Sequence, residues 1–311
     1  MGAYIKGNVC ATRETKRRTR RGIVESLFFV DNGEMDCKPL TVVAAGFPEM
    51  WQPVYDKYRL FFELAIKLQP IVNEMTQRPM SGQLSQIVCR MVLAAANTNG
   101  ALLTLVLNGY GHDAMKLARS IYETELNIVW LKKHPEDIRD FVDYLIIRHK
   151  LTYDQMDKEQ QQQLPMESYE RMMTKYAEVL PRFAIPRDKT RPRNEWCRVS
   201  ISEKAKEAGL LELHRTFYRW ASSMHHGDIG GLSSQADSEG KADVAPSWSW
   251  LELALVSGLG SFVRCLGHFD EIAQLGFKER LENGPNQDYA VAVKGLPPPT
   301  LGKPEVPQRE T

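Results

Sequence analysis

The segment Ala114–Lys133, AMKLARSIYETELNIVWLKK, decides the fold expected for this chain. Apolar residues recur along it at helical spacing, among them Leu117, Ile121 and Leu126. That i, i+3, i+4 pattern is typical of an amphipathic helix that buries one face against a core. We therefore expect a helix over the whole segment, with Asp113 as the residue that caps its first turn.

The same periodicity continues on both sides of this segment. Further helices are expected over residues 48–77, 81–107, 135–151, 166–180, 200–209 and 211–225, and from 246 to beyond 266. Gly109 and Gly111 are expected to end the second of these helices, because glycine is common just past a helix end. Ser200-Ile-Ser-Glu203 forms a capping box, which marks a helix start. The sequence therefore predicts an all-α, multi-helix bundle.

The two ends of the chain differ from this helical part. Residues 1–46 form a basic N-terminal appendage with the run Lys16-Arg-Arg-Thr-Arg-Arg21. It is interpreted either as a flexible arm or as a short β-hairpin, since Asn32-Gly33 between apolar runs is a hairpin signal. Residues 47–282 are expected to be one helical domain. Residues 283–311, with Pro297-Pro-Pro299, are expected to be a disordered tail.

Bulk properties exclude several classes of protein. The net charge is only +1, so binding of a polyanion must depend on local patches. The five cysteines are widely spaced and include no C-x-x-C pair, which argues against a disulfide framework and a thiolate zinc site. No signal peptide is recognisable, and apolar stretches such as Ala101–Leu107 are too short to span a bilayer. A cytoplasmic protein that does not bind a membrane is expected.

The stretch Arg219–Gly227, RWASSMHHG, carries the densest group of chemically capable side chains. On a helix, Arg219, Ser222 and His226 form one stripe, while His225 points elsewhere. A histidine near a helix C-terminus has its protonated form favoured by the helix dipole, and beside an arginine it suits an anion or a phosphoryl group. The alternative is that the histidines only cap the helix end.

A second polar group lies on the segment that decides the fold. Arg119 and Glu123 are four residues apart and share one side of an otherwise apolar helix. They are either an ordinary surface ion pair or part of a polar site. In the second case the two helices should pack together and bring Arg119, Glu123, Ser222 and His226 within reach. No metal-ligand spacing or phosphate-binding loop is present, so neither a metal nor a cofactor is expected.

The segment 181–198 is rich in proline and basic residues. The basic residues are Arg182, Arg187, Lys189, Arg191, Arg193 and Arg198. A positive loop near the polar stretch would guide a nucleic-acid backbone. The alternative is a solvated linker without a specific partner.

Both polar motifs together resemble an uncharacterised bacterial family, one of the domains of unknown function. The matching residues are Arg119-Ser-Ile-Tyr-Glu123 and Tyr218-Arg-Trp-Ala-Ser222-Ser-Met-His-His226-Gly227. The resemblance extends over roughly residues 84–269. It implies an all-helical bundle with a shared polar site made of Arg119, Glu123, Ser222 and His226, and it implies no known reaction.

A more distant similarity is to HEPN-type domains. Arg219 followed by His225 or His226 fits their Arg-x4-6-His pattern, although Trp220 stands where a polar residue is usual. The similarity implies a metal-independent ribonuclease of a toxin or phage-defence type, with RNA as its partner and a homodimer as its assembly. In that hypothesis His226 is the general acid or base, Arg219 or Arg119 neutralises the phosphate, and the RNA 2′-hydroxyl attacks.

The alternative function is non-catalytic. The protein would then be a sensor or adaptor whose pocket binds a small anionic ligand, or whose bundle binds a partner protein. Glu123 favours this alternative, since a carboxylate repels a phosphate unless an arginine pairs with it.

Overall fold

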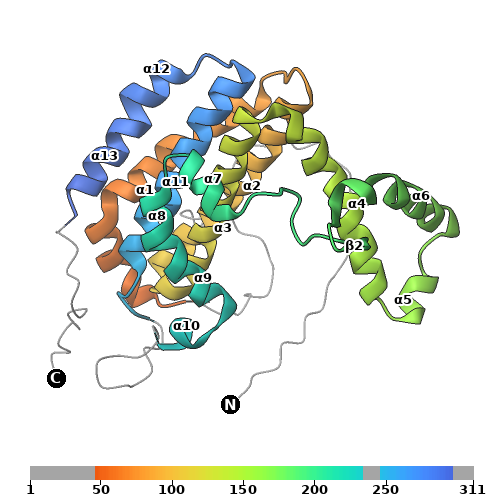
Figure 1. Cartoon of the computed structure of the whole chain (residues 1–311). Coiled ribbons are helices and arrows are strands. Elements are labelled where there is room, and N and C mark those ends of the chain that lie inside the picture. The colour runs from red at the N-terminus through yellow and green to blue at the C-terminus, as the bar shows by residue number, and fades with distance from the viewer. Residues whose placement is uncertain (1–45, 234–245, 297–311) are drawn as a thin grey trace, which may run out of the picture. The chain divides into compact units, whose positions relative to one another are not determined.

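The computed structural model describes residues 46–233 and 246–296 of the chain. Within these residues nearly all regular structure is helical, and the one sheet has two short strands (Figure 1). The predicted all-α, multi-helix bundle is therefore confirmed. The predicted N-terminal arm, with its basic run and hairpin signal, lies outside the described residues, as does the Pro297-Pro-Pro299 segment.

Four long helices build the main core. They are α1 (Pro48–Gln77), α2 (Gln83–Leu107), α3 (Gly111–Lys133) and α11 (Leu251–Ala273). α3 packs against α11, α2 packs against both, and α1 adds to α2 and α11 (Figure 1). Met115 and Ile121 of α3 are fully buried in the same core as Leu255 and Leu259 of α11. Each such side chain contributes about 1.5–3 kcal/mol to folding, so the apolar stripe of α3 holds the bundle together.

The start of α3 differs from the prediction. The residue before the helix is Tyr110, and no side chain caps the first turn. Asp113 lies inside the helix and accepts from Lys116 Nζ at 2.7 Å. A Cβ atom on Gly111 would stand 2.9 Å from the backbone nitrogen of Leu251. The predicted cap was wrong because close packing against the start of α11, possible only for a glycine, sets this boundary.

A second, smaller core joins the helices that follow α3. The elements are η2 (Pro135–Asp137), α4 (Ile138–Gln155), α5 (Lys158–Gln162) and α6 (Met166–Phe183). Tyr144 and Ile147 of α4 pack with Val179 and Phe183 of α6. The glutamine-rich connector is itself helical, because Asp157 caps α5 with a full capping box.

The basic segment after α6 is more ordered than a solvated linker. It forms the antiparallel strands β1 (Ala184–Ile185) and β2 (Asp188–Pro192). Arg182 pairs with Asp140 and Asp143 of α4, and Arg193 Nη1 donates to the Arg182 carbonyl at 3.0 Å. These two arginines therefore stabilise the fold, whereas Arg187, Lys189, Arg191 and Arg198 are exposed. Guidance of a nucleic acid by these exposed residues stays a prediction.

The next elements carry the polar stretch. They are α7 (Ile201–Glu207), α8 (Leu211–Leu213), the π-helical turn η3 (His214–Tyr218), α9 (Arg219–His226) and α10 (Ile229–Ser233). The predicted capping box is confirmed, since Ser200 and Glu203 each accept from the other's backbone N–H. Gly227, with φ of 61°, ends α9 in the left-handed conformation that glycine adopts readily.

The predicted tail begins too early. Beyond α11 the chain continues as α12 (Lys278–Leu281), η4 (Glu282–Asn286) and α13 (Gln287–Lys294). α13 packs against α1, and Tyr289 donates its hydroxyl hydrogen to the Val256 carbonyl at 2.9 Å. Pro285 interrupts regular α-helical bonding, and the chain passes it as a π-helical turn before the helix resumes. The division of the chain near residue 46 stays a prediction.

By length and composition α2 passes the test for a membrane span, with a mean hydropathy of 1.3. This differs from the expectation that no apolar stretch is long enough. Core helices of soluble proteins also pass that test, and α2 packs against both α3 and α11. The expected cytoplasmic location and the absence of a membrane partner stay predictions.

Candidate functional site

The site is built where α9 packs across α3. On α3, Arg119 Nε donates to Glu123 Oε1 at 2.7 Å. The Arg119 side chain is only 13% exposed, and that of Glu123 is 35% exposed. The pair is therefore not an ordinary surface ion pair, because its arginine is mostly shielded from water and lies under residues of another helix.

Tyr218 completes the hydrogen bonding of this pair. Arg119 Nη2 donates to the Tyr218 hydroxyl at 3.3 Å, and that hydroxyl donates to Glu123 Oε1 at 2.9 Å. The guanidinium also lies 5.1 Å from the centre of the Tyr218 ring, within range of a cation–π contact. Burial, reinforced by the Glu123 charge, raises the pKa of Tyr218 to about 12. Tyr218 therefore keeps its proton at neutral pH and acts as a fixed donor.

His226 stands at the open edge of the cluster. Its Nε2 lies 3.5 Å from Arg119 Nη1, and the residue is exposed. A guanidinium has only donors, so Nε2 must be the acceptor in this contact. A hydrogen bond between the two side chains would have the ring proton on Nδ1 and Nε2 as the acceptor.

The neighbouring His225 is also affected by this cluster, through a ring contact and through the charge of Arg119. Its ring lies 5.3 Å from the His226 ring in an edge-to-face arrangement. Partial burial, followed by the positive charge of Arg119, lowers the pKa of His225 below its usual value. The sequence predicted that His225 points away from the stripe of Arg219, Ser222 and His226, and the structure places its ring against the ring of His226.

Two predicted residues do not join the hydrogen-bonded group. Arg219 is exposed at the start of α9, and its side chain forms no hydrogen bond or ion pair within the described residues. Ser222 is half-buried between Tyr218 and His226 along the helix and likewise makes no hydrogen bond in the part of the chain that the structure describes. The structure thus brings Arg119, Glu123 and His226 together as predicted and adds Tyr218. Their catalytic role stays a prediction.

The π-helical turn η3 contains Tyr218, and aromatic neighbours hold the Tyr218 ring in position. The His214 ring stacks on the Tyr218 ring with centroids 4.5 Å apart, and Tyr122 of α3 lies 5.7 Å from Tyr218. Burial, followed by the Arg219 charge, lowers the pKa of His214, so the ring packs as a neutral aromatic. Turns of this kind occur often at functional sites, and here the turn directs Tyr218 at Arg119.

One comparison with known proteins identifies relatives of this site. Residues 85–243 match the family model DUF5677, a family of unknown function. The matched region contains the Arg119–Glu123 pair and the whole of α9. The chain belongs to this family. The predicted resemblance to an uncharacterised domain family is confirmed, and no curated protein or solved structure matches the chain.

Two further polar residues, Ser223 and Asp228, shape the end of α9. Ser223 donates its hydroxyl hydrogen to Asp228, whose carboxylate also accepts from the Gly231 backbone at 2.9 Å. Asp228 therefore begins α10. Within residues 46–233 and 246–296, no group of three or more histidine, cysteine, aspartate or glutamate side chains is placed to hold a metal ion.

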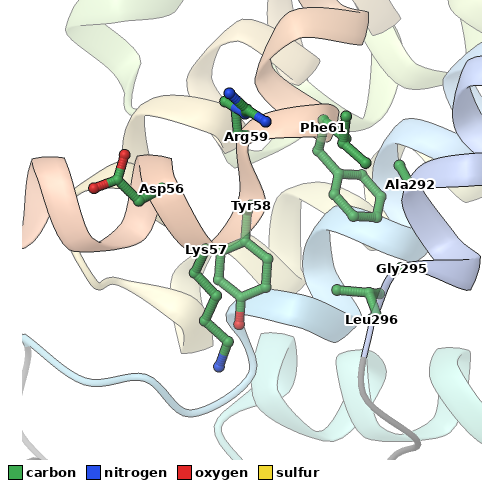
Figure 2. Close-up of a pocket in the computed structure, with 9 residues that line it drawn as sticks. Asp56, Lys57, Tyr58, Arg59, Phe61, Ala292, Gly295 and Leu296 are labelled. Atoms are coloured by element: carbon green, nitrogen blue, oxygen red, sulfur yellow. The ribbon is translucent and has the colours of Figure 1, made fainter.

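A shallow cavity of this DUF5677 protein lies elsewhere, between α1 and α13. It has a volume of about 200 Å³ and is lined by Lys57, Tyr58, Phe61 and Leu296, among others (Figure 2). The Lys57 side chain extends alongside the Tyr58 ring, 5.2 Å from its centre. None of the predicted site residues lines this cavity.

Proposed function

We propose that this DUF5677 protein is a metal-independent ribonuclease of the HEPN-like type, with a role as a toxin or in phage defence. One observation carries the proposal. The exposed His226 places its Nε2 3.5 Å from a guanidinium that Glu123 and Tyr218 hold in place. A neutral imidazole fixed next to a cation is the arrangement that general base catalysis on a phosphodiester requires.

The chemistry needs only the substrate's own nucleophile. His226 takes the proton of an RNA 2′-hydroxyl, and the 2′-oxygen attacks the adjacent phosphorus. The bond to the 5′-oxygen breaks, and that oxygen takes a proton from the imidazolium or from water. The products are a 2′,3′-cyclic phosphate and a 5′-hydroxyl, and no group outside the protein and the RNA is consumed.

The two arginines have different parts in this proposal. Arg119 Nε and Nη2 already serve Glu123 and Tyr218, so Arg119 mainly positions His226. Arg219 is exposed, about two helical turns from His226 on the same face of α9, and its donors are available for a phosphate. Glu123 does not oppose phosphate binding, since Arg119 neutralises its charge.

The test is cleavage of a labelled single-stranded RNA by the purified full chain. We expect fragments that end in a 2′,3′-cyclic phosphate and that form in the presence of a chelator. Replacement of the general base typically costs about 100- to 10,000-fold in rate, and we expect His226→Ala to fall in this range.

The matched control is His149→Ala, which removes an exposed histidine on α4. We expect this variant to cleave at the unaltered rate. Equal rates for the unaltered chain, His226→Ala and His149→Ala would attribute any cleavage to a contaminant and would reject the proposal.

A second candidate function is a non-catalytic sensor or adaptor that binds a small anionic ligand or a partner protein. It is favoured by the mutual neutralisation of Arg119 and Glu123, which leaves the inner part of the site with little net charge to stabilise a transition state. A thermal-shift screen with nucleotides and RNA separates the two functions, because a ligand raises the apparent stability by mass action. A nucleotide that stabilises the protein, together with intact RNA, would favour the sensor. The expected homodimer stays a prediction under either function.

A further inference from the structure

We infer that the face of α9 beside His226 binds single-stranded nucleic acid, with an unpaired base stacked on Trp220. This inference rests on the proposed function, because it names the form of RNA that the same site receives. The surface consists of three tryptophans, Trp220, Trp250 and Trp248, which we call the tryptophan row, and of the cations Arg219 and Lys57.

Trp220 is the exposed member of the row. Its side chain is 49% exposed, although it follows directly after Arg219 in the polar stretch. Its ring lies 5.7 Å from the Trp250 ring, at an interplanar angle of 41°. Trp250 and Trp248 rest on the main core, so they give the row a fixed base while Trp220 offers ring surface to solvent.

The backbone at Trp250 is held in an uncommon conformation. Its φ is 67° and its ψ is −5°, which places a bulky residue in the left-handed region. Such a conformation is unfavourable for a residue with a large side chain and persists where the surroundings enforce it, often at functional surfaces. Here the strained residue directly precedes α11 and sets its ring against Trp220.

Two members of the row have a positive charge beside them. Arg219 adjoins Trp220, and Lys57 Nζ lies 5.1 Å from the centre of the Trp248 ring. The negative charge of Glu252 helps to raise the pKa of Tyr58, which lies next to Lys57. Because this negative charge disfavours a phosphate there, Arg219 is the more favourable cation for a phosphate. A flat aromatic ring next to a guanidinium is the combination that binds a base and its phosphate in single strands.

The helical geometry connects this surface to the cleavage site. At about 100° per residue, Arg219 and His226 share one exposed face of α9, and Trp220 lies roughly a quarter turn away. A phosphate held by Arg219 would therefore have His226 on one side and the stacked base on the other. A base in a duplex is already stacked and paired, so this arrangement selects unpaired strands.

The alternative occupant of this surface is a partner protein. Ile229 and Leu232 on the neighbouring α10 are 83% and 56% exposed, and apolar side chains of this kind also occur at protein interfaces. The cations beside the row favour a polyanion, because an apolar protein interface does not need Arg219 beside Trp220.

The test measures binding of a fluorescent single-stranded DNA oligonucleotide to the full chain by anisotropy. DNA lacks the 2′-hydroxyl and is not cleaved by the proposed mechanism, so binding is measured independently of the reaction. Loss of a stacked base weakens binding by about tenfold, and we expect this loss for Trp220→Ala and a smaller one for Trp220→Phe. Single-stranded RNA of the same sequence should follow the same order.

The matched control is Trp51→Phe, which alters another half-exposed tryptophan, 44% exposed on α1. Its affinity should equal that of the unaltered chain. Equal affinities for Trp220→Ala and the unaltered chain, or a duplex bound as tightly as the single strand, would overturn the inference. So would a Trp220→Ala variant that changes only self-association in analytical ultracentrifugation. If the Trp220 variants bind weakly while His226→Ala still cleaves RNA normally, the stacking surface stands and the proposed reaction fails.

Discussion

Two arginine–glutamate pairs share helix α3, and they differ in how completely each is closed. Glu125 is 1% exposed at its side chain and receives two hydrogen bonds from Arg264 of α11, at 2.5 and 3.0 Å. Glu123, two residues earlier, is 35% exposed and shares one oxygen between Arg119 and Tyr218. The first pair joins α3 to α11 inside the bundle. The second pair ends at an exposed histidine.

A structural ion pair and a candidate site differ in where their hydrogen bonds lead. Both pairs satisfy the charge of a carboxylate, which burial alone would make costly. In the inner pair the Glu125 oxygens are both bonded, and a neighbouring Ser261 Oγ accepts from Arg264 at 3.2 Å. In the outer pair the hydrogen bonds continue through Arg119 to His226, which faces solvent. The outer pair is therefore the one whose hydrogen bonds lead to an exposed histidine.

The largest expected effect breaks the inner pair. In Arg264→Met, the Glu125 carboxylate stays buried without its partner, and such a loss typically costs about 3–5 kcal/mol. We expect the free energy of unfolding, measured by urea denaturation, to fall by this amount. The double variant Arg264→Met, Glu125→Leu should recover most of the loss, because an apolar pair needs no hydrogen bonds.

The matched change in the outer pair is Arg119→Met. Glu123 is more than one-third exposed and keeps the Tyr218 hydroxyl, so we expect a loss of about 1 kcal/mol. Equal losses for the Arg264 and Arg119 variants would remove the distinction between a closed structural pair and an open site.

A smaller effect concerns the dependence of stability on pH, which we attribute to a histidine of α11. Burial, followed by the charges of Lys132 and Arg264, lowers the pKa of His268 on α11 to about 4. The carboxylate of Glu271, 3.9 Å from His268 Nδ1, does not offset this. At pH values between about 6.5, the pKa of His268 in the unfolded chain, and about 4, its pKa in the folded chain, His268 binds a proton in the unfolded chain but not in the folded chain. Stability therefore falls as the pH falls through this window.

The corresponding variant isolates this contribution. We expect His268→Gln to lose about 3 kcal/mol less than the unaltered chain between neutral pH and pH 4, by urea denaturation at each pH. His149→Gln, which alters an exposed histidine, should retain the full dependence. Identical pH profiles for all three chains would show that His268 is not held neutral by burial.

Much of the fold could be predicted from the sequence, because burial repeats with the period of the helix. The stripe through Ile121 and Leu126 predicts α3 and its partners, and both residues are fully buried. The start of α3 could not be predicted, since it depends on contact between Gly111 and a segment far along the chain. α13 was missed because Gly284-Pro285 resembles the start of a tail, and only its packing on α1 reveals a helix.

The candidate site could be predicted in part. Spacing alone indicated Arg119, Glu123 and His226, since each lies on the polar side of an apolar helix. Tyr218 was quoted only as part of the family motif, although it lies four residues before Ser222 on the same side. Its role depends on the π-helical turn and on the stacked His214, which no local pattern reveals. Arg219 was grouped with His226 but not with the exposed Trp220.

The proposed reaction requires that Arg119 acts through His226 in one site. A double-mutant cycle on the rate of RNA cleavage tests it most directly, with Arg119→Ala, His226→Ala and the two combined. We expect the combined variant to be no slower than His226→Ala alone, because Arg119 has nothing left to position. Losses that multiply, or an unaltered chain that cleaves no RNA, would contradict the account.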